Sequence, residues 1–249
     1  LTPQAILGRL QPYMSRLAAP GRAAPSRHRT MRDAIDWSYS LLDEPEQAVF
    51  ARLSVFAGGF TLEAVEAVAG QDAAGNGSAP ALDALDAVSA LIDKNFLQHE
   101  EGAGGEGRYR MLEMIREYAL DRLAERGELD ALQRDHAAYY LRLAETILSR
   151  DPMADERHVT RRLAVEQRNM ETALVWANAC SNPDMALRLC AALYRFWAND
   201  GRYEEGRQWL ERVIERAPPV ASAPRGHALI GLGVMLFFQG NYQAAAATW

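Results

Sequence analysis

Lysine is nearly absent from this sequence: the 249 residues contain one, Lys94, and no G-x-x-x-x-G-K-[ST] pattern. A phosphate-binding loop of that type needs a lysine directly after a glycine-rich turn, because the ammonium group neutralises the phosphates. The H-E-x-x-H, G-x-S-x-G and paired-cysteine patterns are also absent. The histidines stand apart from any carboxylate or nucleophile at a motif-like spacing; they are His28, His99, His136, His158 and His227. We therefore expect a chain that is not an enzyme, with no catalytic residue, no metal and no cofactor of its own.

Cysteines and long apolar runs are scarce as well. Cys180 and Cys190 lie in apolar helical stretches without ligand-like neighbours, so we expect buried, reduced thiols rather than a disulfide or a metal pair. No apolar run approaches the roughly 20 residues of a membrane-spanning helix. Gln4, Arg9 and Gln11 interrupt the N-terminal segment, which argues against a signal peptide. These features predict a cytoplasmic protein that does not contact a membrane.

The net charge of −6 conceals an uneven distribution. Residues 1–32 carry six arginines and no acid, whereas the rest holds 21 basic and 33 acidic residues. That balance argues against a protein that coats nucleic acid, although the basic segment could still meet a phosphate. With 49% hydrophobic and 24% charged residues, the chain is long enough for two globular domains. It begins at Leu1 and ends at Trp249 within a helical pattern, so we expect a part of a larger protein.

Helix signals follow one another closely after a linker rich in proline, glycine and alanine. Thr30, Asp43 and Thr61 are the expected N-caps of three helices, because their side-chain oxygens can accept from free backbone N–H groups. The first of these helices is expected to run through Leu42.

The periodicity then changes. A fourth helix is expected from Pro80 to about Lys94, and two strand-like runs, 95–100 and 108–111, flank a glycine-rich tip and predict a hairpin. Another helix follows over residues 112–125. Helices followed by a hairpin are the order of a winged-helix domain, which we place at residues 27–127, with a generic α+β linker domain as the alternative.

From residue 128 to 249 the pattern is helical throughout. The expected helices span 129–150, 157–180, 184–199, 203–216 and 225–239, with another that begins at Tyr242. Gly201-Arg202-Tyr203 recurs 39 residues later as Gly240-Asn241-Tyr242. The residues around the second copy resemble the tetratricopeptide signature; they are Leu229, Leu232, Gly233, Phe237, Gln239, Gly240, Tyr242, Ala245 and Trp249.

The residue types in this copy suit paired helices. Small Gly233 and Ala245 would let the two helices touch, and Tyr242 and Trp249 would fill the groove between them. In the first copy Tyr194 stands where a small residue is expected.

We interpret residues 184–217 and 225–249 as tetratricopeptide-like antiparallel helix pairs, with a chance helical hairpin as the alternative. Repeats of this kind bury their core only by stacking. This requirement implies either a longer array or a capping role for residues 157–199. Because such arrays typically present a concave surface to another molecule, we expect a binding partner on the repeats.

Charge argues against DNA binding by the expected winged helix. Its helix in the recognition position, residues 81–94, carries Asp83, Asp86 and Asp93 against Lys94 alone. Negative charge opposes entry into a phosphate-lined groove, and the helix offers no arginine, asparagine or glutamine to read a base edge. We therefore expect this domain to make contacts within the protein, and we keep direct DNA binding as a second hypothesis.

Two stretches resemble a known family: RHRTMRDAIDWSYSLLDEPEQAVFARLSVFAGGFTLEAVEAV (27–68) and YRMLEMIREYALDRL (109–123). Both are similar to the winged-helix portion of STAND-type signalling ATPases of the NB-ARC class, found in large bacterial transcriptional regulators. The resemblance implies a switch in which an upstream nucleotide-binding domain holds ADP or ATP and the winged helix closes over it. The repeats would sense a protein or small-molecule inducer, and another domain would bind DNA. Residues 1–26 would be the tail of the upstream helical subdomain and a linker.

The resemblance also points to candidate site residues. Met111-Leu112-Glu113 aligns with the Met-His-Asp motif of the family, whose histidine touches the β-phosphate of ADP in several members. Leu112 replaces that histidine, and leucine cannot donate to a phosphate. Glu113 takes the place of the acid and is one nucleotide-proximal candidate. Arg27, His28 and Arg29 are the others on charge grounds, and the alternative is that residues 111–119 simply begin a core helix.

Overall fold

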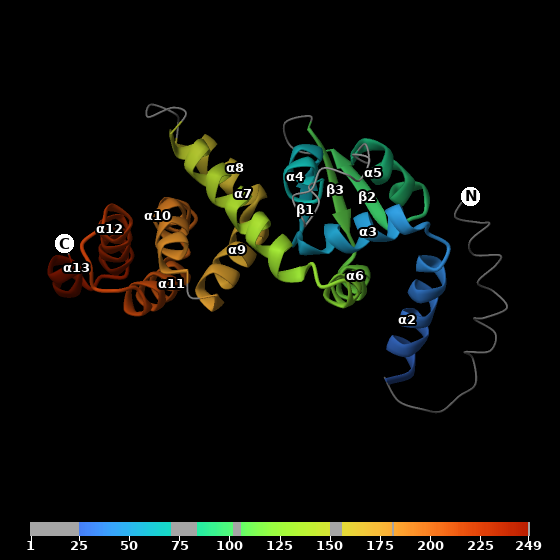
Figure 1. Ribbon diagram of the computed structural model, residues 1–249. Helices are drawn as coiled ribbons and strands as arrows, with labels where there is room; N and C mark the ends of the chain where they lie inside the picture. The colour runs from blue at the N-terminus through green and yellow to red at the C-terminus, as the bar shows by residue number, and fades with distance from the viewer. Residues whose placement is uncertain (1–24, 71–83, 102–105, 150–155, 181, 249) are drawn as a thin grey trace.

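The computed structural model describes residues 25–70, 84–101, 106–149, 156–180 and 182–248. Over these ranges the chain is mainly α-helical with one small sheet, as the sequence predicts. The mixed α and β part lies at one end of the molecule, and helices α7 to α13 extend from it to the other end (Figure 1). The expected tail of an upstream subdomain, residues 1–26, lies almost entirely outside the described residues.

The first part combines helices with a sheet. Its elements are α2 (Pro25–Tyr39), α3 (Glu44–Arg52), the short 3-10 helix η1 (Leu53–Val55), β1 (Gly59–Thr61), α4 (Leu62–Val68), α5 (Ala84–Asp93), β2 (Leu97–Glu101), β3 (Gly107–Met111) and α6 (Glu113–Glu125).

Two of the three expected helix caps are confirmed. The Asp43 carboxylate accepts from the Glu46 N–H at 2.9 Å, while the Glu46 carboxylate accepts from the Asp43 N–H at 3.0 Å, which makes a reciprocal capping box. Thr61 accepts from the Ala64 N–H and caps α4. The prediction for Thr30 is wrong, since α2 is already helical at Pro25 and ends at Tyr39 rather than Leu42. Proline is tolerated in a first helical turn, where its missing N–H is not needed.

The expected hairpin is confirmed as β2 and β3, and a third strand, β1, completes an antiparallel sheet in the order β1-β3-β2. Phe60 pairs with Tyr109, and His99 pairs with Tyr109 from the other side. The sequence analysis missed β1 because a strand of three residues is too short to show an alternating pattern. The residue before it, Gly58, has a φ of +100°, a backbone conformation that favours glycine.

A continuous apolar core runs from this part into the helical part. The rings of Phe50 and Phe96 lie 4.8 Å apart, and Phe56 stacks on Phe60 at 4.6 Å. Phe56 also meets Tyr140 of the next helix with ring centroids 6.4 Å apart. Phe50, Phe56 and Phe60 are fully buried. Because Phe56 also contacts Tyr140, the core continues beyond residue 127.

The remaining helices follow the predicted order with one difference. They are α7 (Leu129–Ser149), α8 (Glu156–Val165), α9 (Gln167–Ala179), α10 (Pro183–Asn199), α11 (Tyr203–Arg216), α12 (Ala223–Phe238) and α13 (Tyr242–Thr248). The helix expected over 157–180 is therefore divided into α8 and α9 by Glu166, whose backbone (φ −100°, ψ 6°) leaves the helical region. Sequence periodicity alone did not reveal this break, because the apolar spacing continues across it.

Close packing at glycines joins the helix pairs. A Cβ atom on Gly231 of α12 would lie 2.8 Å from Cβ of Tyr194 on α10. The bulky Tyr194, unexpected at a position that usually holds a small residue, is thus accommodated by a glycine on the facing helix. The predicted small residues Gly233 and Ala245 are both buried.

The prediction for Tyr242 is wrong. Its side chain is 63% exposed and meets only the edge of the Phe237 ring among the described aromatic contacts, at 5.2 Å between centroids. In the first pair, by contrast, Tyr203 stacks on Phe238 at 5.1 Å. Trp249 lies outside the described residues.

The two cysteines have different environments. Cys190 is fully buried in α10 as expected, and burial raises the pKa of its thiol well above the usual value. Cys180 is exposed at the end of α9, so the prediction that it is buried is wrong.

We predict that Gly231→Ala destabilises the protein. The added methyl group would overlap Cβ and Cγ of Tyr194, which are held close to the α10 backbone, and overpacking of this kind costs about 1–3 kcal/mol. Gly226→Ala is the matched control in the same helix, because a Cβ there meets nothing within 4 Å and should be neutral or stabilising by up to about 1 kcal/mol. Urea unfolding of both variants measures the difference; equal effects would contradict the close approach.

Candidate functional site

Glu113, the predicted nucleotide-proximal acid, is the first residue of α6 and lies at the surface. Its carboxylate accepts from Arg116, and this interaction lowers the pKa of Glu113, to which the nearby charges of Arg168 and Arg110 also contribute. Arg116 donates as well to the carbonyl oxygen of Ser54 at 3.2 Å. The carboxylate is therefore already neutralised by arginines of the chain itself.

The other residues of the aligned motif have structural positions. Met111 is buried in the core at the end of β3, and Leu112 is the N-cap residue of α6 with no side-chain cap and 45% exposure. This placement agrees with the alternative that the segment begins a core helix.

Arg27, His28 and Arg29 lie in the first turns of α2, but their side chains are outside the described residues. The side-chain contacts between α2 and α6 come from later positions. Arg32 pairs with Asp121, and the Tyr118 hydroxyl donates to Asp36 at 2.6 Å. The assignment of Arg27, His28 and Arg29 as nucleotide-proximal residues therefore stays a prediction.

Helix α5, in the recognition position, keeps the acidic character expected for it. Its buried face holds Ala87, Val88 and Leu91, while Asp86 and Asp93 are exposed. Lys94, which follows the helix, pairs with Glu46 in the first turn of α3. The one lysine near this helix is thus engaged within the domain.

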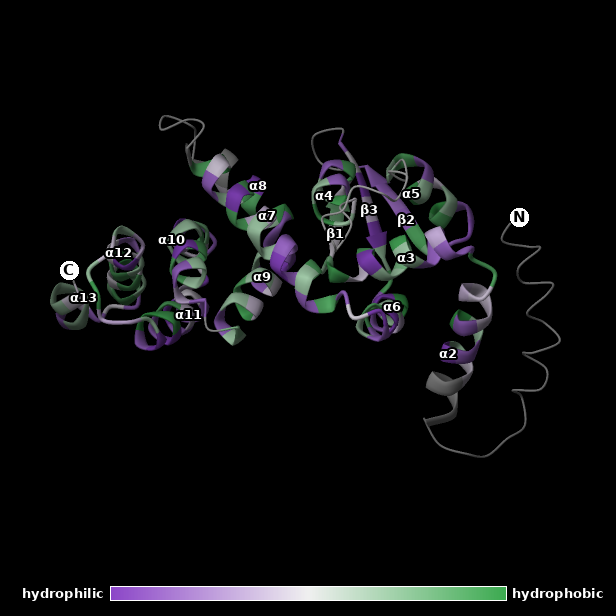
Figure 2. Ribbon diagram, in the orientation of Figure 1, coloured by the Kyte–Doolittle hydropathy of each residue, from purple (hydrophilic) through white to green (hydrophobic). Residues whose placement is uncertain are grey.

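The sheet presents its polar face away from the domain core. Residues alternate across a strand, so Arg108 and Arg110 share this face, whereas Tyr109 and Met111 point inward. Arg110 lies 3.6 Å from Glu100, and both side chains are about half exposed. Figure 2 shows strands β2 and β3 as mostly hydrophilic, in contrast to the hydrophobic α12.

Arg108 behaves differently from its neighbour, because it binds across to the helical part. Its guanidinium pairs with Glu166, the residue between α8 and α9, and donates to the Gly59 carbonyl oxygen at 2.8 Å. The two charged side chains are only 12% and 10% exposed. Charge-assisted hydrogen bonds at so little exposure are directional and strong, so they fix the sheet against the helices.

Asn169 supplies the second connection and is 1% exposed. Its Oδ1 accepts from the Ala57 N–H at 2.8 Å, and its Nδ2 donates to the Gly59 carbonyl at 2.9 Å and to Glu166 at 3.2 Å. The Asn169 side chain therefore binds the N–H of Ala57 and the carbonyl oxygen of Gly59, where the chain enters β1. We call Arg108, Glu166, Asn169 and the loop 57–59 the polar junction.

His136 of α7 also contacts the polar junction. Its Nε2 lies 3.4 Å from Oδ1 of Asn169, and its ring packs against Tyr140 at 4.6 Å and Phe56 at 5.5 Å. Burial lowers the pKa of His136 to about 4, so the ring is neutral at pH 7. Burial and the Glu166 charge raise the pKa of the Tyr140 hydroxyl well above its usual value.

The sequence does not predict the polar junction as a whole, but the position of Glu166 points to it. Glu166 falls between Leu163 and Met170 at the spacing of the buried stripe of this helical region, where a charged residue is unusual. A carboxylate at an apolar position indicates a buried partner, which here is Arg108 on a distant strand.

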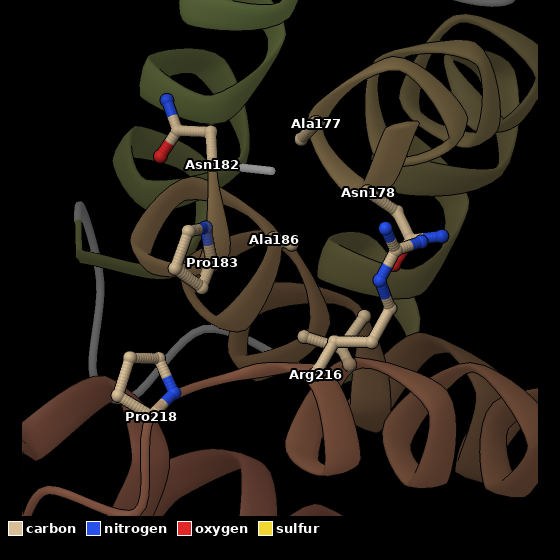
Figure 3. Close-up of a pocket in the computed structure, with 8 residues that line it drawn as sticks. Ala177, Asn178, Asn182, Pro183, Ala186, Arg216 and Pro218 are labelled. Atoms are coloured by element: carbon tan, nitrogen blue, oxygen red, sulfur yellow. The ribbon is translucent and has the colours of Figure 1, made fainter. Parts of the chain in front are cut away.

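The helical part has a small hollow where the turn between α9 and α10 meets the end of α11 (Figure 3). Its volume of about 160 Å³ is below the roughly 300 Å³ of typical ligand pockets. Its lining is Ala177, Asn178, Asn182, Pro183, Ala186, Val213, Arg216 and Pro218. The hollow is too small to define a ligand site.

Two kinds of feature are absent from the described ranges. No group of three histidine, cysteine, aspartate or glutamate side chains in them could hold a metal ion. None of the helices in this part of the chain is both long and apolar enough to cross a membrane.

The helices, the hairpin and the small sheet define a winged-helix domain. Residues 42–124 match the family described as "Winged helix-turn-helix domain". Among known proteins, the chain is similar to "Putative HTH-type transcriptional regulator Rv0890c" of Mycobacterium tuberculosis (strain ATCC 25618 / H37Rv), with 35% identity over 233 residues. "Putative HTH-type transcriptional regulator Mb0914c" of Mycobacterium bovis (strain ATCC BAA-935 / AF2122/97) shows the same identity over the same length. Each alignment covers 92% of this chain but 26% of the relative.

A third relative is similar over a shorter region. "Uncharacterized protein Rv0894" of Mycobacterium tuberculosis is 37% identical over 132 residues, or 53% of this chain and 32% of that protein. No solved structure matches the chain.

We predict that Arg108→Met lowers the free energy of unfolding by about 3–5 kcal/mol, because it leaves the buried Glu166 carboxylate unpaired. Arg110→Met, on the same strand and face, removes a half-exposed pair and should cost about 0–1 kcal/mol. Combining Arg108→Met with Glu166→Leu should recover part of the loss, since no unpaired charge remains. Chemical denaturation of the three variants tests this order, and similar losses for Arg108 and Arg110 would contradict it.

We also predict a pH dependence from His136. Its pKa is about 4 in the folded protein and about 6.5 when unfolded, so the unfolded chain binds more protons between these values. The free energy of unfolding should therefore fall as pH drops from 6.5 to 4, by up to about 1.4 kcal/mol per pH unit from this group. His136→Gln keeps an N–H donor without the titration and should lack this component. Parallel stability curves for the two proteins would contradict the prediction.

Proposed function

We propose that this chain is a non-catalytic regulatory region of a transcriptional regulator, in which the winged helix makes contacts within the protein. The winged-helix match and the two relatives named as HTH-type regulators support the class. The chain spans 26% of the length of those relatives, so the proposal concerns one region of a longer protein.

The observation that carries the proposal is the buried pair between Arg108 and Glu166. The wing strands of such domains can direct basic side chains to a phosphate backbone. Here the arginine nearest the start of β3 binds a carboxylate from the helical part, and Arg110 lies beside Glu100. This engagement of Arg108 within the chain supports the proposed internal role of the winged helix.

The proposal also includes a nucleotide-dependent switch. The family resemblance supports an upstream nucleotide-binding domain as the partner of the winged helix, with ADP or ATP held there and no cofactor in this chain. Leu112 cannot donate to a phosphate, so the winged helix would restrain the switch by packing rather than by touching the nucleotide.

The helical repeats are proposed to receive a protein or small-molecule inducer. Helix α12 supports this role, because it is apolar on both sides and leaves Ile230, Phe237 and Phe238 about half exposed. We further propose a cytoplasmic location without membrane contact, which suits a regulator of transcription.

Direct DNA binding is the alternative function, and the match to a winged helix-turn-helix family favours it. Its electrostatics are poor, since α5 exposes Asp86 and Asp93 and Lys94 is paired with Glu46.

Fluorescence anisotropy with a labelled duplex separates the two functions. We expect binding weaker than about 10⁻⁴ M for the 249-residue chain at low salt, at the weak limit of non-specific DNA binding. Saturable, salt-dependent binding in the micromolar range that Arg110→Glu abolishes would establish the alternative. Binding that Arg110→Glu leaves unchanged would place a DNA contact elsewhere in the chain, and ATP turnover by the chain alone would contradict a non-catalytic role.

A further inference from the structure

The first turns of α9 contact the winged-helix domain closely. Glu166, which separates α8 from α9, holds Arg108 of β3, and Asn169 holds the backbone of Ala57 and Gly59. The side chains of Arg108, Glu166 and Asn169 are almost entirely excluded from water, so a movement of α9 must either carry the loop 57–59 with it or leave these polar groups without partners.

The first turns of α9 also contact α10 and α11, which we call the first helix pair. The Glu171 carboxylate accepts from Gln167 at 2.6 Å and from Arg202 at 3.2 Å. Arg202 lies in the turn between α10 and α11 and pairs with Glu205 as well. Within the six residues from Glu166 to Glu171, one helix end therefore binds both the sheet and the turn of the helix pair.

These contacts meet on one short stretch of chain. Arg202 binds Glu171, Glu171 binds Gln167, Gln167 follows Glu166 directly in the backbone, and Glu166 binds Arg108. The backbone break at Glu166 allows α9 to change its angle to α8, while the α-helical hydrogen bonds keep residues 167–171 rigid. Energetic coupling between distant sites needs a contiguous path of this kind together with an element that can shift.

We propose that residues 166–171 are a coupling segment that transmits displacement of the first helix pair to the loop 57–59 of the winged helix. The inference rests on the proposed function, because it gives the route by which a partner on the repeats would reach the winged helix. It adds a defined element, with Arg202 as the input and the Ala57 N–H as the output.

Hydrogen exchange at the Ala57 amide reads the output directly, because this N–H donates to Asn169. The amide of Leu91 in the buried face of α5 serves as an internal reference for global destabilisation. Asn169→Ala should raise the exchange rate of Ala57 relative to Leu91 by at least about fivefold, since a buried hydrogen bond is lost.

Arg202→Ala is the decisive variant, and its site is not in contact with the polar junction. The coupling predicts that it raises the relative exchange of Ala57 by about two- to fivefold, and that Arg202→Lys restores part of the protection. Arg188→Ala is the matched control, because Arg188 pairs with Glu145 of α7 and with Asp184 of its own helix, neither of which belongs to the coupling segment.

The possible outcomes distinguish the polar junction from the coupling. If Asn169→Ala accelerates Ala57 but Arg202→Ala and Arg188→Ala do not, the polar junction stands and the coupling is overturned. Equal acceleration by Arg202→Ala and Arg188→Ala would also overturn it, since any loosening of α10 would then suffice. If Asn169→Ala itself leaves Ala57 unchanged, the coupling loses its output contact and is overturned, while the Arg108–Glu166 pair that carries the proposed function is tested separately by Arg108→Met.

Discussion

Arg108 and Glu166 form an ion pair across the boundary between the winged-helix sheet and the helical part, where both side chains are nearly excluded from water. Removing two charges from water is unfavourable unless each finds good partners, so their geometry is tightly constrained. Arg108 also needs the Gly59 carbonyl, and Glu166 also needs Nδ2 of Asn169. These groups bring together the start of β1, the residue between α8 and α9, and the first turn of α9.

A buried pair of this kind contributes less to stability than to the choice of one arrangement. Apolar residues of similar volume could fill the same space without the desolvation cost, but they would tolerate several orientations of the sheet. Apolar packing already joins the two parts through Phe56 and Tyr140. The polar groups add direction to that contact, because a displaced α9 would leave the N–H of Ala57 and the carbonyl of Gly59 without partners.

Local chemistry made much of the fold predictable from the sequence. Asp43 and Thr61 predicted their helices because capping depends on residues three positions apart, and two strand-like runs around a glycine-rich tip predicted the hairpin. The failures have a different origin. The short strand β1 pairs with β3, and Arg108 and Asn169 bind its first residue, Gly59, while Glu166 at the break between α8 and α9 binds Arg108. Contacts between residues 49 to 112 positions apart leave little trace in a local pattern.

The function of the candidate site is likewise not determined by the local sequence pattern. A winged-helix architecture does not by itself specify DNA binding, since function depends on the groups that a fold displays. In this chain the acidic α5, the paired Lys94 and the internally bound Arg108 are all unsuited to phosphate contact. Each of these features alone is compatible with a DNA-binding domain that has other basic residues. Together they place two basic side chains of the domain, Arg108 and Lys94, against carboxylates of the same chain, and the carboxylate that binds Arg108 directly precedes α9, the helix that also contacts Arg202 through Glu171.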